Sequence, residues 1–116
     1  IVFDASQLAQ LFVIIFDNAV MHGDDKEKKI SVELEVISRP KNRVILHIMD
    51  NGKGISTHQR NAIFEPFYTT SRQGVGLGLF LAKELCMANR ADIILIDNRK
   101  TTGACFELTF SSTEYR

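Results

Sequence analysis

The apolar residues of the chain recur at intervals that predict both helices and strands. Asp4, followed three positions later by Gln7, resembles a helix-capping box, and a largely apolar stretch over residues 8–20 follows it. Because residues 11–16 are all apolar, we expect the helix that begins here to be buried on most sides.

Alternation of apolar and polar residues marks the strands. Residues 29–37 alternate in this way, which predicts a strand with one solvent-facing side. Residues 44–49 supply a second strand after a turn, so the two should form an antiparallel hairpin. Residues 93–96 and 105–110 form a second predicted pair of strands near the C-terminus.

Helical and loop signals fill the segment between the two hairpins. Ser56 and Gln59 form another capping box, which predicts a short helix that ends near Phe64. Residues 65–76 contain proline and glycine and should form a mobile loop, and residues 77–89 predict a helix. This order of elements predicts an α+β fold, a two-layer sandwich with a mixed, mostly antiparallel sheet covered on one face by about three helices.

Composition and charge narrow the class of protein. The 116 residues fit a single domain over residues 1–116. The apolar share of 45% and the charged share of 24% are typical of a globular chain and exclude a disordered one. The 14 Lys and Arg residues balance the 14 Asp and Glu residues, which argues against a nucleic-acid-binding module, because such modules need a basic face.

The cysteines and the hydropathy pattern bear on the cellular compartment. Cys86 and Cys105 lie far apart and lack metal or redox spacing, so we expect two buried thiols in a reducing compartment. The sequence has no apolar run long enough to cross a bilayer and no signal pattern. We therefore expect a cytoplasmic domain excised from a larger protein, with any membrane anchor of that protein upstream of Ile1.

Asp17 and Asn18 interrupt the apolar stretch of the first predicted helix. Burying a carboxylate and an amide without partners costs about 1–3 kcal/mol each, so each needs a partner. Their oxygens suit a hard cation such as Mg²⁺. Hydrogen-bonded polar residues at the edge of the buried face would explain the pair as well, and both explanations stay open.

Two glycine-containing segments could contact a nucleotide. Residues 50–55 (DNGKGI) follow the second strand, where Asp50 could accept a hydrogen bond from an exocyclic amine, although a simple turn explains this segment equally well. Residues 74–79 (GVGLGL) lead into the last helix, where backbone N–H groups favour phosphate. The surrounding pattern fits neither a Rossmann unit nor a Walker-type loop.

The order of these segments is more specific than any one of them. Four segments reproduce, in order, the N, G1, F and G2 boxes: Asp-Asn-Ala on the first helix, DNGKGI after a hairpin, IFEPFYTT at residues 63–70 and GVGLGL before the last helix. The chain therefore resembles the Bergerat-fold (GHKL) ATPases, shared by histidine kinases, gyrase, Hsp90 chaperones and MutL. IFEPFYTT looks like the sensor histidine kinases. The loop over residues 67–74 is short, as in the nitrogen-regulation type of kinase. Residues 78–86, 88–91 and 103–106 are similar to the kinases that control type IV pilus expression.

The resemblance implies a site for ATP and Mg²⁺. Asn18 would bind the metal and bridge it to the triphosphate, with Asp17 as a second candidate catalytic residue, and Asp50 would hold the adenine amino group. Glycines would let the base lie close, two phenylalanines would pack the base of a lid, and the glycine turn would contact the phosphates. The other implied nucleotide-binding residues are His22, Gly52, Gly54, Ile55, Phe64, Phe67, Thr69, Thr70, Gly74, Gly76, Leu77, Gly78 and Leu79.

Three positions depart from the kinase pattern. Ile14 stands where an Asn is frequent, Met21 where a phosphate-binding Lys is frequent, and Ala104 where a Thr hydroxyl usually lies near adenine. We therefore expect nucleotide binding that is weaker than usual and metal-dependent. Candidates for the missing phosphate contacts are His22, Lys26 and Arg72. His22 could equally be a cap at the helix end.

The three histidines lack a phosphoacceptor context. His22, His47 and His58 have no adjacent acidic partner at the start of a long helix, and His47 should be an exposed strand residue. The resemblance thus implies a phosphoacceptor histidine in a separate dimerisation domain, a downstream response regulator, and a largely monomeric isolated domain. Two alternatives remain: an anti-sigma-factor serine kinase, suggested by residues 18–23, and a degenerate nucleotide-binding module that only docks partners.

Overall fold

The computed structural model of the chain shows two α-helices, one 3₁₀ turn and four strands in its described part. It describes residues 3–22, 29–37, 43–52, 54–55, 59–67, 77–97 and 103–111, with the backbone alone for residues 19–22. In chain order the elements are α1 (Ala5–His22), β1 (Ile30–Ile37), β2 (Arg43–Asp50), η2 (Ala62–Phe64), α2 (Gly78–Ala88), β3 (Ala91–Ile96) and β4 (Cys105–Ser111).

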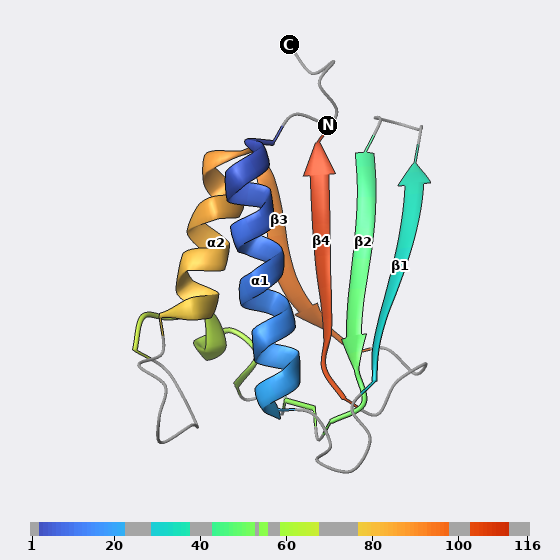
Figure 1. The fold of residues 1–116 in the computed structure, drawn as a ribbon, viewed down its shortest axis with the longest axis vertical. Helices are drawn as coiled ribbons and strands as arrows, with labels where there is room; N and C mark the ends of the chain where they lie inside the picture. Colours follow the sequence, from blue (N-terminus) through green and yellow to red (C-terminus); the bar gives the residue numbers. More distant parts are fainter. Residues whose placement is uncertain are drawn as a thin grey trace.

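The four strands form one sheet in the order β1-β2-β4-β3. Both predicted hairpins are confirmed, since β1 pairs with β2 and β3 pairs with β4. A parallel pair is not found among the described strands, because β2 and β4 are also antiparallel. The helices α1 and α2 lie side by side on one face of the sheet, which confirms the two-layer α+β sandwich (Figure 1).

The first helix begins at a cap that the sequence predicted in part. The Oδ1 of Asp4 accepts a hydrogen bond from the backbone N–H of Gln7 at 2.9 Å and one from the Oγ of Ser6 at 2.7 Å. In a capping box the Gln7 side chain would accept the Asp4 N–H. Here Asn89 accepts it instead, with 2.9 Å between Asp4 N and Asn89 Oδ1. The cap of α1 is therefore completed from the end of α2.

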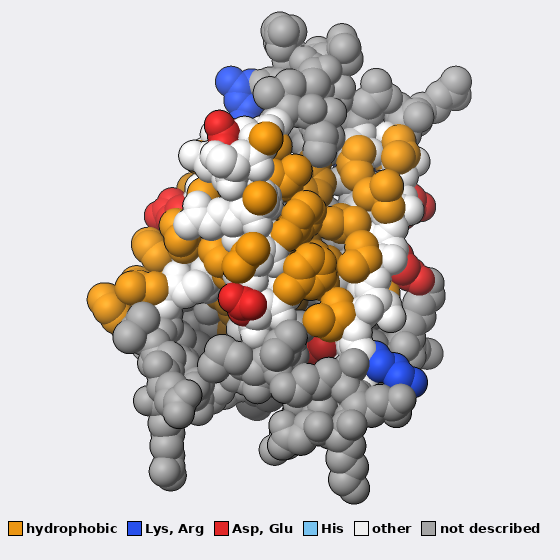
Figure 2. Space-filling view, in the orientation of Figure 1, with side chains coloured by type: hydrophobic (Ala, Val, Ile, Leu, Met, Phe, Trp, Pro, Cys, Tyr) orange, Lys and Arg blue, Asp and Glu red, His pale blue; other side chains and the backbone are white. Residues whose placement is uncertain are grey.

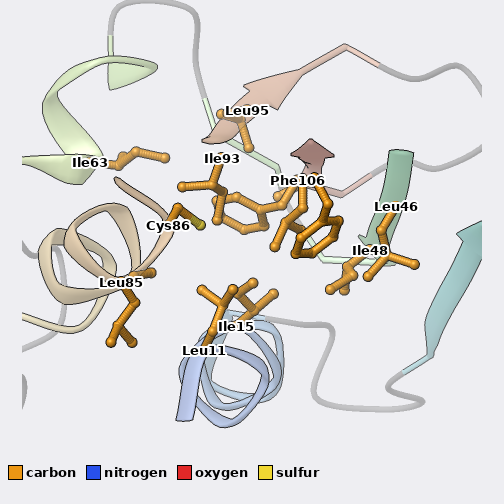
Figure 3. Close-up of a cluster of buried hydrophobic side chains, with 14 residues drawn as sticks. Leu11, Ile15, Leu46, Ile48, Ile63, Leu85, Cys86, Ile93, Leu95 and Phe106 are labelled. Atoms are coloured by element: carbon orange, nitrogen blue, oxygen red, sulfur yellow. The ribbon is translucent and has the colours of Figure 1, made fainter. Parts of the chain in front are cut away.

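The core lies between the two layers (Figure 3). Leu11 and Ile15 of α1 and Cys86 of α2 are fully buried against sheet residues that include Ile93 and Phe106. The core residues on β3 and β4 alternate with residues of the opposite sheet face, which matches the period of a strand. Apolar burial of this kind contributes about 1.5–3 kcal/mol for each large side chain.

The burial of α1 differs from the expectation. Leu11 and Ile15 are fully buried, but Val13 between them is 58% exposed. The helix covers the sheet with one side, and in a fold of two layers the other side of the helix meets solvent. The expectation of burial on most sides is therefore wrong.

The burial of β1 also differs from the expectation. The apolar side of this strand was predicted to be buried, but every residue from Ile30 to Val36 is exposed. Figure 1 shows the reason, because the helices lie over the β3 and β4 side of the sheet and β1 forms the opposite edge. No described helix covers β1.

The helix α2 runs from Gly78 to Ala88, close to its predicted bounds. The predicted short helix ends at Phe64 as expected, but η2 is a 3₁₀ turn of only three residues, Ala62–Phe64. The predicted cap at Ser56 lies outside the described residues. Arg90 follows α2 with a left-handed backbone, at a φ of 57°. None of the helices in the described ranges combines the length and apolarity needed to cross a bilayer.

The burial of the two cysteines and of His47 can also be compared with the predictions from sequence. Cys86 and Cys105 are both buried free thiols, as expected. Burial raises the pKa of Cys86 to about 12, and the negative charge of Asp92 adds to this rise. His47 is not the exposed residue that we expected, because it is half-buried and its Nε2 lies 2.9 Å from the Oε2 of Glu107.

Candidate functional site

Asp50 is a buried carboxylate at the end of β2. Its side chain shares a sheet face with Leu46 and Ile48, so it lies on the side that carries the helices. The Oδ1 of Asp50 accepts a hydrogen bond from Gly52 N at 2.8 Å and a longer one from Ala104 N at 3.2 Å. Two backbone donors thus fix the orientation of the carboxylate, which has about four acceptor positions in all.

The two hairpins meet at this carboxylate. The backbone N–H of Asp50 donates to the carbonyl oxygen of Ala104 at 3.0 Å, so β2 and the start of β4 are joined in both directions. Gly103 lies so close that a β-carbon on it would overlap Asp50 Oδ1. The sequence pattern did not predict that Gly103 and Ala104 hold Asp50.

The segment after Asp50 forms a compact turn. Gly52 is buried, and Gly54 has a φ of 78°, a left-handed conformation that glycine adopts at low cost. Ile55 is half-buried and packs against the core. The Oδ1 of Asn51 accepts the backbone N–H of Lys29 at 3.0 Å, which ties the turn to the start of β1. This role of Asn51 was not predicted.

Asn18 lies near the end of α1. Figure 1 shows the end of α1, the end of β2 and the start of α2 at the same end of the molecule. Ile14, one helical turn earlier, contacts the start of α2, since a β-carbon on Gly78 would lie 3.5 Å from Ile14 Cγ2. Asn18 is half-buried and Asp17 is exposed. The prediction of two buried polar residues is therefore wrong for Asp17, whose catalytic role stays a prediction.

The start of α2 has the features of an anion-binding helix terminus. Leu77 occupies the cap position without a side-chain cap hydrogen bond, and the first turn contains no acidic residue. Gly78 and Leu79 supply the first backbone N–H groups, which point out of the helix end and carry the positive end of its dipole. These features are compatible with phosphate binding, and the phosphate contacts of residues 77–79 stay a prediction.

The two phenylalanines of the predicted lid base behave differently. Phe64 packs edge-on against Phe106 with ring centroids 6.3 Å apart, and Lys83 Nζ lies 5.2 Å from the Phe64 centroid. Phe67 is 72% exposed and has a φ of 68°, which is strained for a bulky residue. Phe64 therefore packs against the sheet and Phe67 is exposed, and the packing of both residues at the base of the lid stays a prediction.

Several residues with predicted roles lie outside the part of the chain that the structure describes. They are Thr69, Thr70, Gly74 and Gly76 of the loop, the side chains of Met21 and His22 in α1, and Lys26, His58 and Arg72. Their roles stay predictions. The described part of the site therefore consists of three pieces: the Asp50 turn, the end of α1 and the start of α2.

The described metal-ligating groups fit a metal ion that binds together with substrate phosphates. Among the described residues, no group of three or more His, Cys, Asp or Glu could hold a metal ion. The amide oxygen of Asn18 is a single hard ligand on α1. Mg²⁺ usually keeps several waters and takes one or two protein oxygens together with substrate phosphates, so one amide is enough for this mode of binding.

Comparison with known proteins agrees with this geometry. A family profile described as "Histidine kinase-, DNA gyrase B-, and HSP90-like ATPase" matches residues 3–114. Sensor protein kinase PilS of Pseudomonas aeruginosa is 35% identical over 109 residues, which cover 93% of this chain and 20% of that protein. The chain therefore spans about a fifth of this curated relative.

Solved structures share the fold. The mycobacterial sensor histidine kinase MprB has a TM-score of 0.83 at 23% identity, covering 96% of this chain and 76% of that chain. Full-length ShkA, solved in complex with AMPPNP, has a TM-score of 0.75 at 26% identity, covering 92% of this chain and 22% of that one. The chain belongs to the histidine kinase-, DNA gyrase B- and HSP90-like ATPase family, and within it to the ATP-binding catalytic domains of sensor histidine kinases.

Proposed function

We propose that this chain is the catalytic part of a sensor kinase that transfers the γ-phosphoryl group of ATP to a histidine in a separate dimerisation domain. A response regulator would then receive the phosphoryl group. The observation that carries the proposal is the buried Asp50 carboxylate, held through Oδ1 by Gly52 N and Ala104 N. A buried acceptor at a fixed angle can recognise the exocyclic amine of adenine.

The other pieces would position the triphosphate. The backbone N–H groups at the start of α2 would contact the phosphates, and Asn18 would hold Mg²⁺ against them. Bound Mg²⁺ would neutralise charge on the phosphates. Asp17, which is exposed, remains a second candidate catalytic residue next to this position.

The transfer itself is a substitution at phosphorus. A nitrogen of the acceptor imidazole forms a bond to the γ-phosphorus, the bond from that phosphorus to the β–γ bridging oxygen breaks, and ADP leaves with the oxygen. The contribution of this chain is positioning and charge neutralisation, because little covalent chemistry is left for protein groups in such a transfer.

The departures from the kinase pattern support weaker binding. Ile14 is apolar and half-buried against the start of α2, so it offers no ligand to the metal or the phosphates. Ala104 has no hydroxyl, but its backbone N–H still reaches Asp50. These two residues also motivate the alternative that the chain is a degenerate nucleotide-binding module.

Calorimetry with ATP and Mg²⁺ tests the nucleotide site. We expect measurable binding that falls by about tenfold or more for Asp50→Asn, since a buried charge-assisted hydrogen bond contributes about 1.5–3 kcal/mol. Asn18→Ala should reduce the dependence on Mg²⁺. Glu84→Gln and Asn61→Ala change an exposed carboxylate and an exposed amide outside the site and should bind normally. Absence of binding by the unaltered chain would favour the degenerate module.

A transfer assay tests the acceptor. The chain, radiolabelled ATP and a separately purified dimerisation domain of the parent protein should give a labelled product. Phosphohistidine is labile to acid and phosphoserine is stable, so loss of the label in acid supports the histidine kinase. An acid-stable label on a serine would support the anti-sigma-factor type instead. A sedimentation measurement should show the isolated domain as a monomer.

A further inference from the structure

β1 is an exposed edge of the sheet with an uncovered apolar side. In the described part of the chain only β2 pairs with it, and β1 is eight residues long. Val32, Leu34 and Val36 are 52%, 66% and 67% exposed. A long edge strand with exposed apolar side chains is a template for pairing with another strand. We call this edge, with these three side chains, the β1 surface.

The β1 surface continues an apolar sheet face. Leu34 pairs with Leu46 and Val32 pairs with Ile48, so the apolar side chains of the two strands point to the same side. Leu46 and Ile48 belong to the buried core. Figure 2 shows the hydrophobic side chains of this face extending towards the margin where Figure 1 places β1, with acidic side chains along that margin.

The other side of β1 carries negative charge. Glu33 and Glu35 alternate with the apolar residues and are both exposed. Their neighbours across the hairpin are His47 and Ile45. A strand that pairs with β1 would place every second side chain beside the two carboxylates and the others beside the three apolar residues.

We propose that the β1 surface binds an extended protein segment in which apolar and basic residues alternate. Such a segment would add a fifth strand to the sheet by backbone hydrogen bonds, with its apolar side chains on Val32, Leu34 and Val36 and its Lys or Arg side chains beside Glu33 and Glu35. A helix would cover the apolar side chains but would leave the edge N–H and C=O groups of β1 without partners from the protein.

Charge argues against a second copy of the chain as the occupant. Two copies of β1 paired antiparallel with Leu34 opposite Leu34 would place Glu33 of each copy opposite Glu35 of the other. Like charges directly opposite across two strands are destabilising. A basic strand has the opposite effect at the same positions.

Peptide binding tests the proposal. The probe is a fluorescein-labelled octapeptide of alternating valine and lysine, and its matched control alternates valine and glutamate. At low salt we expect the lysine peptide to bind the chain at least about tenfold more tightly than the glutamate peptide, with the difference shrinking as salt rises. Equal affinity for both peptides, or binding of neither, overturns the proposal.

Variants connect the binding to β1. Glu35→Lys should reduce or reverse the preference between the peptides, and Leu34→Lys should weaken lysine-peptide binding by about tenfold or more. Ile94→Lys is the control, since Ile94 is also an exposed apolar strand residue but lies on β3, at the other edge of the sheet. Equal loss in the Ile94→Lys variant, or no loss in Leu34→Lys, contradicts the assignment.

Hydrogen exchange distinguishes a strand from other modes of contact. Bound peptide should slow exchange of alternate β1 amides, which a helix or side-chain contact would not do. Unchanged β1 exchange in the presence of bound peptide overturns strand addition, as does concentration-dependent dimerisation that Leu34→Lys abolishes. None of these variants touches the nucleotide site, so failure here leaves the proposed kinase function intact.

Discussion

Gly103 lies directly against Asp50, with no room for a β-carbon between them. A β-carbon on Gly103 would overlap Asp50 Oδ1 and would lie 2.6 Å from the backbone N of Gly52. The same Oδ1 accepts hydrogen bonds from Gly52 N and Ala104 N. The turn before β4 therefore holds the carboxylate at the end of β2, although Gly103 is 53 positions after Asp50 in the chain.

Gly103→Ala should impair both folding and ATP binding. The added methyl group must displace backbone and carboxylate atoms, and overpacking of this kind costs about 1–3 kcal/mol. We expect a lower urea midpoint and, because the orientation of Asp50 changes, an ATP affinity reduced by about tenfold in calorimetry. Gly78→Ala is the stability control, because its β-carbon meets only Ile14 at an ordinary 3.5 Å. Equal stability of the two variants would contradict the close-contact explanation.

Asn89→Ala should loosen the junction between the two helices. Asn89 accepts a hydrogen bond from Asp4 N and donates to Gln7 Oε1 at 2.7 Å and to Leu85 O at 2.8 Å. Loss of a half-buried side chain with three bonds should lower the free energy of unfolding by about 1–3 kcal/mol. Asn61→Ala removes an exposed asparagine that makes no cap bond, and its urea midpoint should not change.

The Arg90→Gly variant should be more stable than the Arg90→Ala variant. Arg90 follows the last turn of α2 at a φ of 57°, where a side chain costs about 1–2 kcal/mol and glycine is preferred. Arg90→Gly and Arg90→Ala both remove the contacts of the arginine side chain, so their difference isolates the backbone effect. We expect the free energy of unfolding of the glycine variant to exceed that of the alanine variant by about 1 kcal/mol, with a correspondingly higher urea midpoint. Equal urea midpoints for the two variants would contradict the backbone explanation.

Cys86 should make stability fall in alkaline solution. Its folded pKa, about 12, lies above the ordinary value of 9.0 because burial disfavours the thiolate. The stabilising contribution is therefore complete below pH 9 and is lost as the pH rises towards 12, because the unfolded chain releases the proton first.

Urea unfolding across this range measures the effect. Cys86→Ala should reduce the alkaline slope relative to the unaltered chain, and iodoacetamide should alkylate Cys86 only as the chain unfolds. Rapid alkylation of Cys86 in the folded chain at neutral pH would contradict its burial.

Local patterns were enough to predict most of the secondary structure. The alternation in residues 29–37 and the pairing of 93–96 with 105–110 became β1 and the β3–β4 hairpin, because strand period and turn residues are local properties. The predicted cap at Asp4 was half right, because Gln7 N is local but Asn89 reaches Asp4 from 85 residues away.

Burial was predicted less well, because it depends on which elements cover one another. In sequence, β1 has the same alternation of apolar and polar residues as a strand with a buried side. Leu34 is exposed only because the helices lie over the β3 and β4 side of the sheet. His47 was expected in solvent, yet Glu107 on β4 lies beside it. No local pattern records which strand becomes the edge of a sheet.

The sequence alone determined the family and the kinds of residue in the site, because Asp50, Asn18 and the glycine turn occur in a specific order. Only the tertiary structure decided how Asp50 is held and which strand stays open. Those properties arise where distant segments meet, since the bond from Ala104 and the fit of Gly103 exist only once the two hairpins are side by side.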